Sequence, residues 1–93
     1  MREVQTSVRP GQTVYIVIGQ MVMAATVEEI CIRVDKRGAS ERLYVSFDEP
    51  DTFRPGKTRT SYEWCLLGRA DRIYLAAFLT LEVALEARNV WAD

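Results

Sequence analysis

Residues 22–34 read Val-Met-Ala-Ala-Thr-Val-Glu-Glu-Ile-Cys-Ile-Arg-Val, and their apolar side chains alternate in two phases. One phase comprises Met23, Ala25 and Val27, and the other comprises Ile30, Ile32 and Val34. A strand whose inward face changes parity needs one extra residue. We therefore predict a β-bulge or a sharp bend at Glu28-Glu29. Such a bend lets a small sheet curl over and close into a barrel.

Strand signals lie on both sides of this segment. β-Branched composition or apolar alternation predicts strands at 14–18, 43–47, 62–66 and, more weakly, 73–75. Gly19-Gln20 is typical of a tight hairpin turn. Polar stretches at 35–41 and 49–60 separate the later strands, and Pro50, Pro55 and Gly56 keep the second stretch irregular.

The C-terminal segment predicts one helix. Thr80 is a good N-cap, Glu82 lies in the first turn, and Asn89 is a plausible C-cap. The alternative is a single helix from Asp71 to Arg88. We favour a strand followed by a helix because Thr80 suits a cap better than a helix interior.

These elements predict a mainly β protein with a C-terminal helix, built as a small SH3-like barrel of four to five strands. A chain of 93 residues allows one domain, residues 1–93. Within it we expect the barrel over 12–76 and the helix over 80–89.

Composition restricts the chemistry. Twelve basic and thirteen acidic residues give a net charge of -1, which excludes a binder that depends on bulk positive charge. The chain has no histidine, so the commonest general base and the commonest zinc ligand are both missing. We expect no catalytic residues, no metal site and no cofactor. An enzyme would need a site assembled across an oligomer.

The two cysteines bear on the compartment. Cys31 and Cys65 each lie in an apolar stretch, which favours buried, reduced thiols in a cytoplasmic protein over one bridge between neighbouring strands. The uncharged run from Pro10 to Val27 is interrupted by polar residues, so we expect neither a membrane span nor a secretion signal.

The candidate binding residues lie mainly in one polar loop. Phe53 is an aromatic residue among Arg54, Lys57 and Arg59, a composition common in protein-binding hot spots and in single-stranded nucleic acid sites. The alternative is that Phe53 packs back onto the barrel and the cations are solvated. Trp91 is a second candidate, as a core plug or as part of a self-association surface.

A resemblance to a known family rests chiefly on the C-terminal run 77–87, Ala-Phe-Leu-Thr-Leu-Glu-Val-Ala-Leu-Glu-Ala. It resembles the Val-Phe-Leu-Thr-x-Glu-Glu-Ala-x-x-Ala-Leu ending of many small phage and mobile-element proteins. Residues 13–17, 25–30 and 62–64 are similar to earlier segments of those proteins. Val83 replaces the second glutamate of the motif, and 69–77 is longer than the usual gap.

The resemblance implies the fold and a mobile-element origin, without an activity, because functions in that family are mostly unassigned. We therefore expect a non-enzymatic protein-interaction module, such as a phage accessory protein or a host-defence inhibitor. Nucleic-acid association through the barrel face and Lys57 and Arg59 is the alternative. A homo-oligomer stays open.

Overall fold

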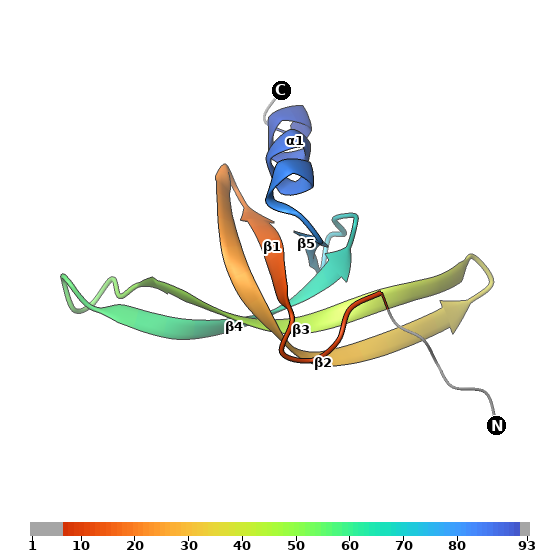
Figure 1. Cartoon of the computed structure of the whole chain (residues 1–93), viewed down its shortest axis with the longest axis horizontal. Coiled ribbons are helices and arrows are strands. Elements are labelled where there is room, and N and C mark those ends of the chain that lie inside the picture. Colours follow the sequence, from red (N-terminus) through yellow and green to blue (C-terminus); the bar gives the residue numbers. More distant parts are fainter. Residues whose placement is uncertain (1–6, 92–93) are drawn as a thin grey trace.

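A computed structural model describes residues 7–91, with Trp91 described by its backbone alone. The elements in chain order are β1 (Thr13–Ile18), β2 (Met21–Asp35), β3 (Gly38–Pro50), β4 (Thr58–Leu67), β5 (Leu75–Phe78) and α1 (Leu81–Trp91). β1 to β4 form an antiparallel meander. β5 then pairs antiparallel with β1 and parallel with β4, which closes the barrel (Figure 1). The predicted mainly β barrel with a C-terminal helix is confirmed.

β2 is bulged at Glu28, within the Glu28-Glu29 pair where the change of parity predicted a bulge or bend. Val27 pairs with Val45, but the next pair joins Glu29 to Tyr44, so Glu28 is the extra residue of a β-bulge. Its carboxylate accepts a 2.6 Å hydrogen bond from the Ser46 hydroxyl. The bulge lets Val27 point inward before it and Ile30 after it, as the alternation predicted.

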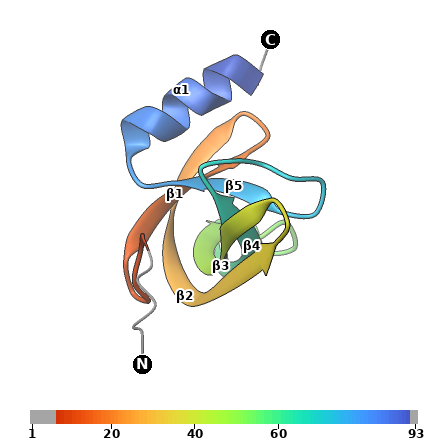
Figure 2. The same cartoon turned by 90° about the vertical axis from the view of Figure 1, so that its right-hand side faces the viewer.

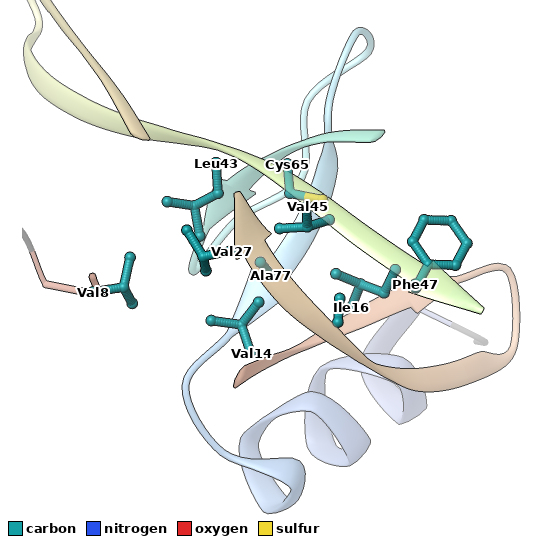
Figure 3. Close-up of a cluster of buried hydrophobic side chains, with 10 residues drawn as sticks. Val8, Val14, Ile16, Val27, Leu43, Val45, Phe47, Cys65 and Ala77 are labelled. Carbon is teal, nitrogen blue, oxygen red and sulfur yellow. The ribbon is translucent and has the colours of Figure 1, made fainter. Parts of the chain in front are cut away.

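The barrel interior is small and apolar. The buried cluster consists of Val8, Val14, Ile16, Ala25, Val27, Leu43, Val45, Phe47, Cys65 and Ala77 (Figure 3). No polar or charged residue is buried in the part of the chain that the structure describes. Burial of these side chains at roughly 25 cal/mol per Å² is therefore the main force that holds the barrel together.

The two cysteines belong to strands that are not paired with each other, because β3 lies between β2 and β4. Both are free thiols, and the predicted reduced state agrees with this arrangement. Cys65 is fully buried, and burial raises its pKa to about 12, with a smaller contribution from Glu63. Cys31 is only half-buried, which differs from the burial expected of it.

Two long hairpins leave the barrel in opposite directions (Figure 1). The β2–β3 arm ends at the turn 36–37, and the β3–β4 arm ends at the loop 51–57. On the β2–β3 arm the alternation of Ile30, Ile32 and Val34 continues, but Val34 is 75% exposed because the strand has passed the end of the barrel. The arms give the molecule its greatest extent of 51 Å.

α1 covers the barrel wall formed by β1, β2 and β5 (Figure 2). Ala84 is fully buried there against Val17, Ala76 and Phe78. The predicted N-cap is present, since the Thr80 hydroxyl oxygen accepts a 3.2 Å hydrogen bond from the Val83 backbone N–H.

Several boundaries differ from the prediction. The loops expected at 35–41 and 49–60 are shorter, because the paired strands continue beyond the barrel: β3 spans Gly38–Pro50 and β4 begins at Thr58. β5 spans Leu75–Phe78 rather than 73–75, so the barrel extends past residue 76. The Ala-Ala pair fits here because small side chains suit the crowded seam between β1 and β4, whereas Ile73 is 80% exposed in the preceding loop. α1 continues to Trp91, so Asn89 lies inside the helix rather than capping it. The alternative of one helix from Asp71 is wrong.

Candidate functional site

The loop that carries Phe53 is an ordered turn built on one carboxylate. Asp51 Oδ1 accepts a 2.9 Å hydrogen bond from the Phe53 backbone N–H, and Oδ2 accepts one of 2.9 Å from Arg54 Nε. These two bonds hold the pKa of Asp51 below its ordinary value, and the bond from Phe53 has the larger effect. We call residues 51–57 the β3–β4 tip.

The backbone of the β3–β4 tip is closed on itself. The Asp51 N–H donates to the Lys57 carbonyl at 2.8 Å, and the Lys57 N–H donates to the Arg54 carbonyl at 3.1 Å. Gly56, at φ +78°, takes the left-handed position that a turn following Pro55 requires. The tip therefore holds its shape without packing on the barrel.

Phe53 is 86% exposed at this tip. The alternative in which its ring packs back onto the barrel is therefore wrong. Among the described residues, Phe53 is the most exposed of the large hydrophobic side chains. The arrangement presents one aromatic side chain at the far end of an arm.

Most of the cations near the tip are paired. Arg54 Nε lies 2.9 Å from Asp51, and Arg59 Nη2 lies 2.8 Å from Glu49 Oε1. Hydrogen bonds from Ser61 and then Arg59 lower the pKa of Glu49. Lys57 has no carboxylate within 4.0 Å among the described residues. The structure thus brings Phe53, Arg54 and Lys57 into one tip, with Arg59 further down the arm and engaged elsewhere.

Trp91 is the last residue of α1, and its side chain lies outside the described part of the chain. Its two predicted roles therefore stay predictions.

A second surface, which the sequence reasoning missed, lies on the outer face of β3 and β4. The rings of Tyr44 and Tyr62 are stacked, with centroids 5.7 Å apart and planes 17° apart. Trp64 also packs against Tyr44, with ring centroids 5.0 Å apart and planes tilted by 42°. We call Tyr62, Tyr44 and Trp64 the aromatic row. It forms because cross-strand pairing places Tyr44 opposite Trp64, and Ser46 opposite Tyr62.

Arg42 continues the aromatic row toward the β2–β3 arm. Its guanidinium carbon lies 6.0 Å from the Trp64 ring centroid and 5.8 Å from that of Tyr74. Its Nη1 also donates a 2.9 Å hydrogen bond to the Tyr74 hydroxyl. The cation is therefore held between two rings, a geometry that guanidinium groups favour.

Beyond Arg42 the β2–β3 arm and the β4–β5 connection enclose a groove of about 780 Å³. We call it the basic groove, and the lining residues that define it are Arg33, Lys36, Arg37, Arg42, Arg69 and Tyr74. Two carboxylates, Asp35 and Asp71, also line it, so the basic groove carries an excess of three positive charges. Asp35 accepts from the Arg37 backbone N–H, and Asp71 accepts from that of Ile73.

The chain is nearly neutral as a whole, and this local excess comes from residues spread between positions 33 and 69. No single window of sequence shows it. The basic hairpin turn at Lys36-Arg37 and the alternation of Arg42 with the buried Leu43 are the signals from which it could have been found.

Among residues 7–91, no group of three or more acidic or cysteine side chains is placed to hold a metal ion. No helix in the same part of the chain is long and apolar enough to cross a membrane. No family model, no curated protein and no solved structure matches the chain.

Proposed function

We propose that this protein is a non-enzymatic interaction module that binds a protein partner through the β3–β4 tip. The observation that carries the proposal is the 86% exposed ring of Phe53 on a turn organised by Asp51. Aromatic side chains, phenylalanine included, and arginine are enriched in protein–protein interfaces. A preorganised turn also lowers the entropic cost of burying that ring in a partner.

The pairing of the nearby cations favours a protein over a nucleic acid at this tip. Arg54 and Arg59 each face a carboxylate, so a phosphate there would compete with Asp51 and Glu49. Lys57 alone adds too little charge for phosphate binding, which depends on several cations acting together. The alternative of nucleic-acid binding through Lys57 and Arg59 is therefore the weaker one for the tip.

We further propose that the protein is a cytoplasmic accessory protein of a phage or mobile element. The free thiols of Cys31 and Cys65 support a reducing compartment. The resemblance of 77–87 to phage protein endings supports the origin. An enzyme completed by a second copy is less well supported, because no histidine is present and the Cys65 thiol is held in its neutral form by burial.

Photo-crosslinking tests the proposal. A benzoylphenylalanine at position 53, on an exposed tip, should capture a discrete protein from an extract of the host cells. The same group at Met21, which is 56% exposed in the β1–β2 hairpin, serves as the matched control and should not capture it.

Competition makes the test specific. An excess of the unmodified chain should abolish the crosslinked species, whereas an equal excess of the Phe53→Ala chain should leave it largely intact. The proposal fails if the Phe53→Ala chain competes as well as the unmodified chain, or if position 21 captures the same protein.

A further inference from the structure

We infer that the basic groove and the aromatic row together form a binding site for single-stranded nucleic acid. This site lies outside the β3–β4 tip and does not depend on the proposed protein partner. It combines cations that attract a phosphate backbone with ring faces on which unpaired bases stack.

The basic groove carries a local excess of cations. Side-chain carboxylates offset only part of the five cations of the basic groove, and Arg33 keeps 62% of its side-chain surface exposed beside Asp35. Lys36, Arg37 and Arg69 are exposed as well. A cleft whose walls carry an excess of one sign of charge attracts counter-ions even when the whole molecule is near neutral. The ligand of the basic groove is therefore an anion with several charges.

Arg42 joins the two parts of the site. It lines the basic groove and also lies against the Trp64 ring, the inner member of the aromatic row. A strand whose phosphates occupy the basic groove is therefore led past Arg42 and along the aromatic row to Tyr62. Tyr62 at the outer end is 51% exposed, which leaves its surface open to a base.

The rings favour a single strand over a duplex. Bases inside a duplex are stacked on one another and offer no free face, whereas unpaired bases stack on aromatic side chains. They also favour nucleic acid over an acidic peptide, because a carboxylate chain satisfies the basic groove but has no planar group for the exposed Tyr62. The basic groove suits phosphates and the aromatic row suits bases, and a nucleic acid supplies both groups.

Fluorescence anisotropy with a labelled oligothymidylate of about 12 nucleotides tests the inference. The full chain should bind it at low salt, and log K should fall linearly with log salt. Lys36→Gln with Arg37→Gln, two exposed changes at the arm end, should weaken binding. The change should also reduce the salt slope by about 1.4, the value for two lost phosphate contacts on a single strand.

The ring contribution is measured separately. Tyr62→Ala should weaken binding by about tenfold, the loss expected for one stacked base, and Tyr62→Phe should restore it. The matched charge control is Arg9→Gln with Arg88→Gln, neither of which lines the basic groove. That variant should keep both the affinity and the salt slope of the parent chain.

Three outcomes overturn the inference. The first is the absence of binding at low salt with a correctly folded chain, as judged by its circular dichroism. The second is equal affinity for a duplex of the same length with no effect of Tyr62→Ala. The third is displacement of the oligonucleotide by polyglutamate as readily as by unlabelled oligonucleotide, which would identify an acidic peptide as the ligand. None of these depends on crosslinking at position 53.

Discussion

At the residue scale, Asp51 has the widest influence on the proposed protein-binding surface. Its side chain is only 7% exposed, although it lies at the end of an arm, and it orders the turn through Phe53 and Arg54. A short acidic side chain that accepts its neighbours' N–H groups is the usual way to fix a turn without a core. The exposed ring depends on this carboxylate.

The first prediction concerns the pH dependence of the tip. Because the folded pKa of Asp51 is lowered, its contribution is fully present above the ordinary carboxyl pKa of about 3.9 and is lost as the pH falls through the lowered folded value. We expect the Phe53 amide resonance to move toward its random-coil position with a midpoint below that ordinary value. Nuclear magnetic resonance titration measures it.

Asp51→Asn is the control for this titration. It keeps one acceptor oxygen for the Phe53 N–H but removes the ionisable group, so the acid transition of that amide should disappear. A midpoint at or above the ordinary aspartate value in the parent chain would contradict the assigned role of Asp51.

At the element scale, α1 depends on its first turn and on one buried contact. Ala84 anchors the helix against β1 and β5, and Thr80 satisfies a backbone donor at its start. An isolated helix of eleven residues is marginal in water. Small losses at either point therefore affect the docking of the whole element.

The second prediction follows from the cap. Thr80→Ala should lower the free energy of unfolding by about 1 kcal/mol, because the Val83 N–H loses its acceptor. Thr80→Ser keeps the hydroxyl and should remain close to the parent chain. Urea denaturation followed by circular dichroism measures both. Equal losses for the two variants would show that the methyl group of Thr80, and not its cap, supports the helix.

The elements were predictable wherever one residue pattern decides the local structure. The change of parity around Glu28 requires a bulge in any sheet with one buried face, and Thr80 before an apolar run specifies a helix start. The end of α1 was not predictable from Asn89, because a helix continues past a permissible cap when no glycine or proline stops it. The predicted bounds of β5 were wrong because its alanines have little strand propensity. They form a strand because they pair with β1 and β4 where the barrel closes.

At the scale of the whole molecule, the chain is a small closed barrel with two arms that share its strands. After the bulge at Glu28, the alternation of β2 continues unbroken from buried into exposed surroundings, so the sequence marks the strand but not the point where it leaves the barrel. The basic groove was unpredictable for the same reason. Arg33 and Arg69 are far apart in sequence, and only the closed barrel and its twist bring them to one groove.

The third prediction compares one substitution in the two environments. Ile16→Ala removes a fully buried side chain and should lower the free energy of unfolding by roughly 2–5 kcal/mol, as large-to-small changes in protein cores do. Ile32→Ala makes the same chemical change on the β2–β3 arm, where the side chain is 36% exposed, and should cost about 1 kcal/mol or less. Urea denaturation gives both values.

Similar costs for the two variants would mean that the arm is as integral to the cooperative core as the barrel interior. That result would contradict the division of the molecule into a barrel and two arms.

The opposite directions of the two arms have a consequence for avidity. A ligand on the basic groove and a partner on the β3–β4 tip would occupy different ends of a molecule 51 Å long, so neither would block the other. If both proposals hold and the partner binds the same strand, that strand links the partner to this chain. A short link of this kind raises the effective concentration to the order of millimolar, so a weak contact at Phe53 would then suffice.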